Sequence, residues 1–124
     1  MEFSDTTPIY QQIADDIRTR IISGVLTAGD QLMSTTEYAT TYRINPATAA
    51  KAFSQLVAEG VAEKRRGIGV FVTDSAREIL TTAGRASFVS EHLAPVIADG
   101  LALGFSPDDL RAEVNRLVGE TGKE

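Results

Sequence analysis

The chain has 124 residues, of which 43% are hydrophobic, and its 12 basic and 17 acidic side chains give a formal charge of −5. This length supports one compact domain with an appendage, which excludes a large catalytic cleft between two full-sized domains. The lack of cysteine in the sequence excludes disulfides and thiolate metal sites.

The first residues and the lengths of the apolar stretches indicate where in the cell the protein is expected. Met1–Tyr10 is acidic and polar, without the basic segment and apolar run of a signal peptide. No stretch of the sequence approaches the roughly 18 consecutive apolar residues needed to cross a bilayer. We therefore expect a cytoplasmic protein with no membrane partner.

The negative charge is unevenly distributed along the chain. Residues 1–73 carry seven basic and eight acidic side chains, whereas residues 74–124 carry five and nine. Residues 43–66 have a local excess of three positive charges, supplied by Arg43, Lys51, Lys64, Arg65 and Arg66. This stretch could therefore meet a phosphate backbone despite the acidic total.

An apolar row at a spacing of four predicts a first amphipathic helix and consists of Ile9, Ile13, Ile17 and Ile21. Thr7 suits the cap of this helix and Pro8 its first residue, while Ser23-Gly24 suits its end. The connector Val25–Leu32 contains the turn-prone Ala28-Gly29-Asp30 and is expected to run along the surface.

Two short helices are predicted next. Ser34-Thr35-Thr36-Glu37 indicates a capping box at the start of a helix that ends near Tyr42. Asn45 and Pro46 predict the cap and first residue of a third helix. Its core-facing stripe consists of Ala49, Ala52, Phe53, Leu56 and Val57, and its outer surface of Ala47, Thr48, Lys51, Ser54 and Gln55. This pair of helices is typical of a helix-turn-helix.

A β-hairpin with a basic tip is predicted after the third helix. Its strands are Val61–Arg65 and Val70–Val72, joined by the turn Arg66–Gly69. Lys64-Arg65-Arg66 could be a solvated turn, but its place directly after a helix-turn-helix favours contact with DNA. Gly67-Ile68-Gly69 lacks the third glycine of a nucleotide-binding loop, so it indicates a tight turn.

Residues 74–124 are helical in character, with breaks expected at Pro95 and at Leu103–Pro107. Ser106 suits the cap of the last helix, and the place of Asp108 and Asp109 in its first turn explains them without catalysis. Because two helices of this size cannot bury their apolar faces within one chain, we expect them to pair with a second subunit. The residues assigned to this dimer interface are Ile79, Leu80, Ala83, Phe88, Leu93, Val96, Ile97, Leu101, Leu110, Val114 and Leu117.

Over residues 8–73 the sequence resembles the GntR family of bacterial regulators, and its short YtrA-type branch in particular. The resemblance is carried by Pro8–Ile13, Ile22–Leu26, Gly29–Leu32, Ser34, Ile44–Phe53, Leu56, Glu59–Val61 and Gly67–Val72. Leu103–Ser106 with Leu110 is also similar to the helical tail of that branch. The resemblance implies a mainly α fold with a small β-hairpin, in which a winged helix-turn-helix head over residues 1–73 precedes a two- to three-helix dimerisation tail over residues 74–124.

The family resemblance implies double-stranded operator DNA and a second copy of the chain as partners. We assign DNA contact to Ser34, Thr35, Thr36, Asn45, Pro46, Ala47, Thr48, Lys51, Lys64, Arg65, Arg66, Gly67 and Gly69. Many members carry arginines where this chain has Thr36, Pro46 and Ala50, so bidentate reading of guanine is missing at these positions. The resemblance also places any small-molecule effector in a cavity between tail and head or at the dimer seam.

Two other classes of function stay open at this point. A winged-helix module that binds proteins would not depend on its basic side chains. An enzyme or metal sensor would centre on His92, with Glu91 and Asp99, but a zinc site needs about four ligands. No nucleophile and base stand at a recognisable spacing, so we expect no catalytic residue, metal or cofactor. Tyr38 and Tyr42 could line an effector cavity, but their spacing of four favours packing.

Overall fold

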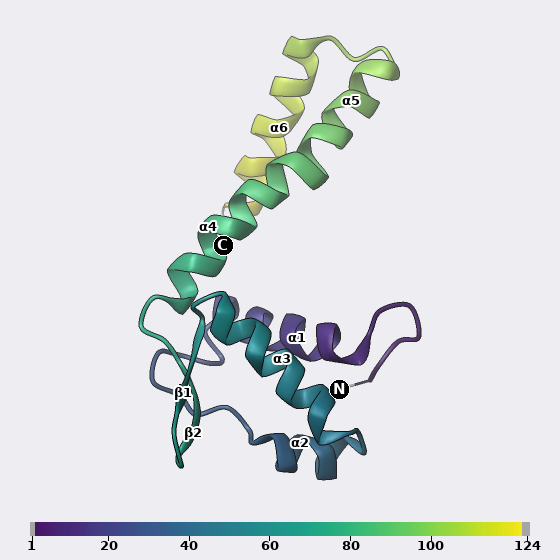
Figure 1. Cartoon of the computed structure of the whole chain (residues 1–124). Helices are drawn as coiled ribbons and strands as arrows, with labels where there is room; N and C mark the ends of the chain where they lie inside the picture. Colours follow the sequence, from purple (N-terminus) through teal and green to yellow (C-terminus); the bar gives the residue numbers. More distant parts are fainter. Residues whose placement is uncertain (1, 123–124) are drawn as a thin grey trace. The chain divides into compact units, whose positions relative to one another are not determined.

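The computed structural model describes residues 2–122 and divides them into two compact units, the first ending at Ala83 and the second beginning at Gly84 (Figure 1). The first unit contains α1 (Ile9–Ser23), α2 (Thr35–Tyr42), α3 (Pro46–Ala58), β1 (Ala62–Arg65), β2 (Gly69–Val72) and the first part of α4 (Ala76–Phe88). The second unit contains the rest of α4, the π-helical turn η1 (Val89–Leu93), α5 (Ala94–Ala102) and α6 (Pro107–Thr121). This arrangement confirms a mainly α fold with a small β-hairpin.

Across residues 2–122, no helix has the length and apolar character that a bilayer span requires.

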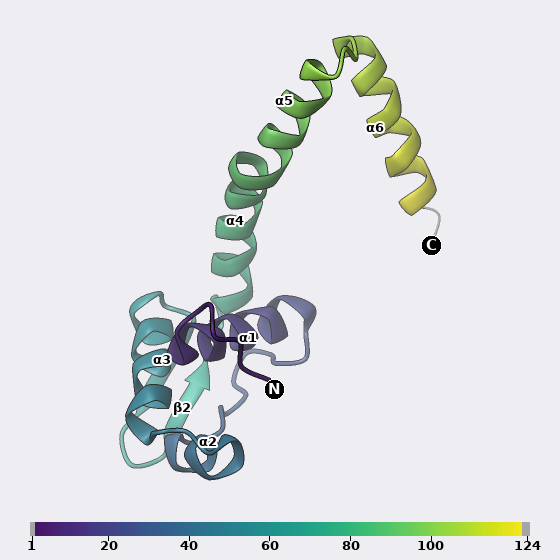
Figure 2. The ribbon, with the colours of Figure 1, turned by 90° about the vertical axis from the view of Figure 1, so that its right-hand side faces the viewer.

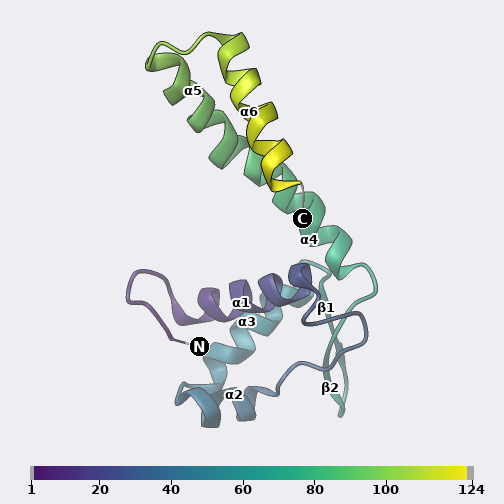
Figure 3. The same ribbon diagram turned by 180° about the vertical axis from the view of Figure 1, so that it is seen from behind.

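The core of the first unit lies where α1 packs on α3 (Figures 1 and 3). Ile13, Ile17 and Ile21 are buried, as the spacing of four predicts. The expected Thr7 cap is wrong: Pro8 is the N-cap of α1 and makes no side-chain cap bond. Instead, the Gln12 amide donates a hydrogen bond of 2.7 Å to the carbonyl oxygen of Thr7 and so fixes the segment that leads into α1.

The helix-turn-helix is defined by two side-chain caps. The backbone N–H of Glu37 donates to the Ser34 hydroxyl at 3.1 Å, and the Glu37 carboxylate accepts from the Ser34 N–H at 3.3 Å. The side-chain oxygen of Asn45 accepts from the Ala47 N–H at 2.8 Å. Both caps confirm the predicted helix starts. Between the helices, Arg43 has a left-handed backbone with φ of 55°, a conformation that L-residues other than glycine rarely adopt.

The connector between α1 and α2 does more than run along the surface. Leu32 donates a backbone hydrogen bond of 2.8 Å to Val70, and Val72 donates one of 2.9 Å to Asp30. Gln31 also forms an isolated bridge with Phe71. Most of this segment is exposed, as expected of a surface connector, but it also pairs with β2 and fixes the hairpin to the helical core.

Two residues differ in burial from what the sequence predicted. Val57, assigned to the core stripe of α3, is 39% exposed, because the stripe ends at Leu56. Leu80, assigned to the dimer interface, is only 7% exposed and packs with Ala76 in the core of the first unit. That burial leaves Leu80 little surface for a partner, so its assignment to the interface is wrong.

The second unit is a helical hairpin whose second arm, α6, follows a loop after α5 (Figure 2). The expected break at Pro95 is wrong, since α4, η1 and α5 follow one another without a loop. In the wider π turn the Ala94 N–H bonds to the Val89 carbonyl, five residues back, which accommodates a proline that has no N–H to donate. The break before Pro107 is confirmed, and Ser106 caps α6 by accepting from the Asp109 N–H at 3.0 Å.

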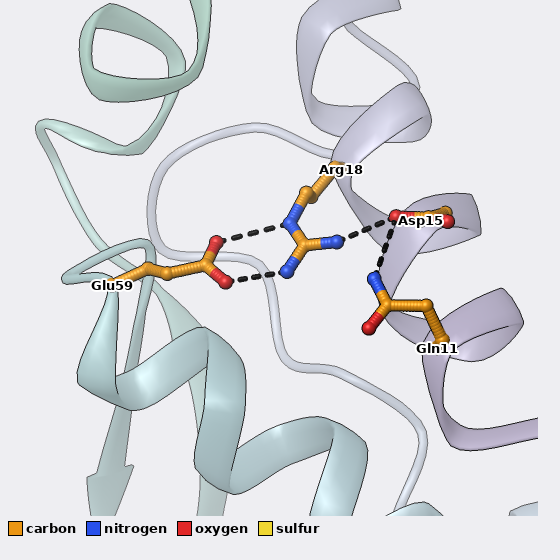
Figure 4. A network of polar contacts seen from close by, with 4 residues as sticks. All are labelled: Gln11, Asp15, Arg18 and Glu59. Atoms are coloured by element: carbon orange, nitrogen blue, oxygen red, sulfur yellow. Dashed lines mark hydrogen bonds and ion pairs between the residues drawn. The ribbon is translucent and has the colours of Figure 1, made fainter. Parts of the chain in front are cut away.

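An ion-pair network links α1 to the end of α3 (Figure 4). The Arg18 guanidinium donates to both carboxylate oxygens of Glu59, through Nε at 2.9 Å and through Nη2, and to Asp15 through Nη1 at 2.6 Å. Gln11 donates to the same Asp15 oxygen at 3.2 Å. The bond to Glu59 is the main reason that the pKa of Arg18 is raised. Because Glu59 is the C-cap of α3, this network fixes the angle between the two helices.

Replacing Arg18 with lysine is expected to lower the free energy of unfolding by about 1 kcal/mol, because an ammonium cannot reproduce the two-pronged contact with Glu59. Urea denaturation at a fixed protein concentration measures this loss. Arg20→Lys is the matched control, since Arg20 pairs with Asp16 one turn away on the exposed side of α1; its effect should stay below about 0.5 kcal/mol. Equal losses in both variants would contradict the structural role given to Arg18.

Tyr38 should make stability depend on pH in the alkaline range. Burial raises the pKa of Tyr38 to about 12, from 10.0. The folded state therefore favours the neutral phenol, so this contribution is complete below pH 10 and is lost as the pH rises towards 12. At pH 11 the wild type should have lost about 1 kcal/mol more than Tyr38→Phe. Urea unfolding between pH 9 and 11.5 measures the difference, and parallel curves for the two proteins would refute it.

Candidate nucleic-acid interface

The exposed face of α3 carries mostly short side chains. Its exposed residues are Pro46, Ala47, Ala50, Lys51, Ser54, Val57 and Ala58. Thr48 and Gln55, which the helical period assigned to the outside, are only partly exposed. Ser34 and Thr36 at the start of α2 are exposed, and Thr35 is half-buried. This surface can therefore approach a partner closely, with few side chains that would have to move aside.

Lys51 is held against the N-terminal end of α1. Its ammonium lies 4.1 Å from the centroid of the Tyr10 ring. A cation over an aromatic face is stabilised by the ring quadrupole, by about 0.5–1 kcal/mol at an exposed site. The positive charge of Lys51 is thus positioned at one edge of α3, where it can meet a phosphate without crossing the face of the helix.

The two strands of the wing pair antiparallel, from Ala62 with Val72 to Arg65 with Gly69. Arg65 donates to a Glu63 carboxylate oxygen at 2.9 and 3.2 Å, and its guanidinium lies 4.1 Å from the centroid of Phe71. This pairing lowers the net charge that Arg65 presents to a partner. Lys64 and Arg66 are exposed, and neither forms an ion pair with another residue in the part of the chain that the structure describes.

The wing turn depends on two glycines and a glutamine. Gly67 has a φ of 76° and Gly69 a φ of 151°, both unfavourable for other residues. Gln31 donates from Nε2 to the Ile68 carbonyl oxygen at 3.1 Å, and a Cβ on Gly69 would lie only 2.5 Å from that nitrogen. Because Gly69 has no side chain, the Gln31 amide has room to hydrogen-bond to the turn. Ile68 at the tip is 66% exposed.

A groove of about 550 Å³ runs between α3, the start of α2 and the wing. Of the residues predicted to contact DNA, it is lined by Ser34, Thr35, Lys64, Arg65, Gly67 and Gly69. The prediction did not include Ala50, Ser54, Val57 and Ile68, which also line it. The helical period had already assigned Ser54 to the outer surface with Ala47, and the spacing of three from Ala47 could have added Ala50 to the same face.

The other candidate residues lie apart from this groove. Tyr38 and Tyr42 pack on each other, with ring centroids 5.4 Å apart, which supports the packing interpretation. They also border a hollow of about 150 Å³, below the usual size of small-molecule pockets.

In residues 2–122, no three histidine, aspartate or glutamate side chains are gathered as a metal site would need, so Glu91, His92 and Asp99 do not form one there.

Comparison with known proteins agrees with this geometry. Residues 9–72 match the family model described as bacterial regulatory proteins, gntR family. The transcriptional repressor YtrA of Bacillus subtilis is 31% identical over 93% of this chain and 88% of its own. A solved transcriptional regulator from Oenococcus oeni is 30% identical with a TM-score of 0.80, over 95% of this chain and 97% of that one. A GntR family transcriptional regulator from Listeria monocytogenes is 30% identical with a TM-score of 0.72, over 92% and 98%.

Proposed function

The chain belongs to the GntR family of bacterial regulatory proteins, and we propose that this DNA-binding transcription regulator acts in the cytoplasm as a homodimeric repressor. Its operator is a pseudo-palindrome whose half-sites lie about one turn of DNA, or a multiple of it, apart, because two-fold protein symmetry is matched by two-fold symmetry in the site. The similarity to a repressor over nearly the whole chain favours repression over activation. The family and these relatives are transcription regulators and not enzymes.

The observation that carries DNA binding is the exposed face of α3 beside a wing with two exposed cations. Lys64 and Arg66 are free to meet phosphates, and Lys51 is held at the edge of α3 by Tyr10. We propose that Arg66 at the wing tip enters the minor groove, whose negative potential attracts guanidinium groups. Asn45 already caps α3 through its side-chain oxygen, so only its amide N–H groups are left for a base or phosphate.

The second unit supports a homodimer because it buries none of its own side chains completely. Within the described residues, η1, α5 and α6 contain no buried residue. Its half-exposed or exposed apolar side chains are Phe88, Val89, Leu93, Val96, Leu101, Leu103, Phe105, Val114, Leu117 and Val118. Apolar surface of this extent on a small unit marks a protein interface. A second copy of the same segment, with the same apolar surface, is the occupant we propose.

The small-molecule effector stays a prediction from the family resemblance. Within the second unit, α5 and α6 enclose a groove of about 420 Å³, which is large enough for a small ligand. Its walls include Ile97, Leu101 and Leu110, with Arg111 and Asn115 as polar groups. Leu101, Leu110 and Val114 line this groove and also belong to the proposed dimer interface, so a ligand there could change DNA affinity by favouring one arrangement of the dimer over another.

The DNA-binding proposal is tested by titrating the promoter upstream of the protein's own gene at several salt concentrations. Wild type should bind in the nanomolar range, and Lys64→Ala/Arg66→Ala should lower both the affinity and the salt dependence, by about 0.9 in log–log slope per lost phosphate contact. Arg65 is left intact because it packs on Phe71. Arg20→Ala, which removes a cation from the exposed side of α1, is the control and should leave the slope unchanged.

The same titration separates DNA binding from the protein-interaction alternative. If the double variant binds as wild type does and no promoter fragment is preferred over random DNA, the wing does not contact phosphates. A winged-helix module that binds another protein would then be the better interpretation.

The dimer proposal is tested by sedimentation velocity on the full chain. Wild type should sediment as two chains at micromolar concentration, and Leu117→Gln should raise the dissociation constant at least tenfold, since each dimer loses two buried leucines. Glu120→Gln, an exposed change three residues further along α6, should have little effect. A wild-type monomer at micromolar concentration would rule out the proposed interface.

A further inference from the structure

We propose that α3 reads its operator by apolar contact between its exposed methyl groups and the methyl groups of thymine in the major groove. The inference rests on the proposed function, that this unit binds double-stranded DNA, and adds the base that its recognition helix selects. It follows from the composition of the exposed face of α3 and from where the one long side chain on that face is directed.

The exposed face of α3 offers no side chain that reads a base edge through two hydrogen bonds. Along it lie Ala47, Ala50, Ser54 and Val57, all short, and Lys51 is the one long polar side chain among its exposed residues. The Lys51 ammonium lies over Tyr10, at the edge towards α1. Bidentate readers of guanine or adenine are arginine, lysine, asparagine or glutamine. With the cation directed sideways, methyl groups and one hydroxyl are left to face the bases.

Thymine is the base whose major-groove edge carries a methyl group, and alanine side chains are suited to contact it. Short side chains also let the helix backbone come close to the base edges, which long side chains would prevent. Each methyl removed from water contributes about a three- to fourfold gain in affinity. Two or three such contacts in each half-site would give a preference for particular thymines.

The surroundings of this face fit DNA and not a purely apolar partner. The groove beside it has apolar walls, formed by Phe53, Val57 and Val70, but Lys64 and Arg65 lie along its wing side. Lys51 bounds the opposite edge of the helix. An apolar strip with Lys51 on one side and the basic wing on the other is complementary to a ligand that combines methyl groups with flanking phosphates, as thymine-containing duplex DNA does.

The test replaces thymine with uracil, which removes the 5-methyl group and keeps the base pairing. Full-length protein is first used to select duplexes from a random-sequence DNA pool. The selected duplex is then synthesised with uracil in place of one thymine at a time, and its affinity is measured at fixed salt. We expect a three- to fourfold loss at two or more positions in each half-site, with no change in the salt dependence.

Variants of α3 show whether such losses come from contact with the helix or from DNA shape. Ala47→Gln and Ala50→Gln each place a longer side chain on the face, and Ala58→Gln makes the same change at the exposed end of α3. All three keep good helix-forming residues, so folding should be preserved. The loss caused by uracil should disappear at one position in Ala47→Gln or Ala50→Gln, and should persist at every position in Ala58→Gln.

The outcomes separate this inference from the proposed function. Enrichment of a duplex that binds in a salt-sensitive way but tolerates uracil at every position would overturn the thymine reading and leave DNA binding intact. Losses on uracil substitution that persist in both Ala47→Gln and Ala50→Gln would also overturn it, since the methyl effect would then act through DNA shape. Failure to enrich any duplex would contradict both proposals.

Discussion

The close approach of α1 to α3 is the constraint on which the rest of the first unit depends. Ala14, Ala49 and Ala52 are fully buried where the two helices meet, so there is no bulky side chain at these points to hold the backbones apart. Ile13 and Ile17 fill the space on either side. The Arg18–Glu59 contact then fixes the far end of α3 to α1. Because one face of α3 is buried against α1, its opposite face is exposed and can contact a partner.

The position of the wing depends on this helix packing, because the segments before and beside the wing are anchored in the core. Val61 lies just before β1 and is fully buried, so the first strand starts from a fixed point in the core. The connector from α1 pairs with the second strand, and Gln31 reaches the turn. The hairpin is therefore held on both sides, although a two-stranded ribbon is only marginally stable by itself. This explains how four-residue strands can carry exposed cations at a defined distance from α3.

Local signals in the sequence predicted most of the elements, because caps and apolar periods act within one or two turns of a helix. The isoleucine row, the Ser34–Glu37 capping box and the Asn45 cap each identified a helix correctly. The pairing of the connector with β2 was missed because it joins segments distant in the sequence. Pairing of Leu32 with Val70 joins residues 38 apart, and no period shows it. Pro95 was predicted to break a helix because the rule assumes α-helical geometry, whereas a π turn accommodates the ring.

The candidate site was predicted in part. The order of elements along the chain identified the basic wing and the start of α2. Which of the basic side chains form ion pairs could not be predicted, because ion pairing depends on the three-dimensional structure. Arg65 therefore ranked equally with Lys64 and Arg66 in the sequence, although it bonds to Glu63 and packs on Phe71. Val57 directly follows Leu56, the last buried residue of α3, and is 39% exposed, so it lies at the edge of the core, which the period of α3 alone does not show.

Because Leu80 and Ala76 are buried, the start of α4 is part of the first unit and not only of the tail. The winged helix-turn-helix motif ends with the hairpin at Val72, but its apolar core is completed by the first two turns of α4. Ile79 lies near Gly60, between α3 and the wing, since a Cβ on Gly60 would be 3.4 Å from the Ile79 side chain. A chimaera spliced directly after the hairpin would exchange part of the core along with the tail. The portable unit, for domain swapping in the laboratory or recombination between genes, extends to about Ala83.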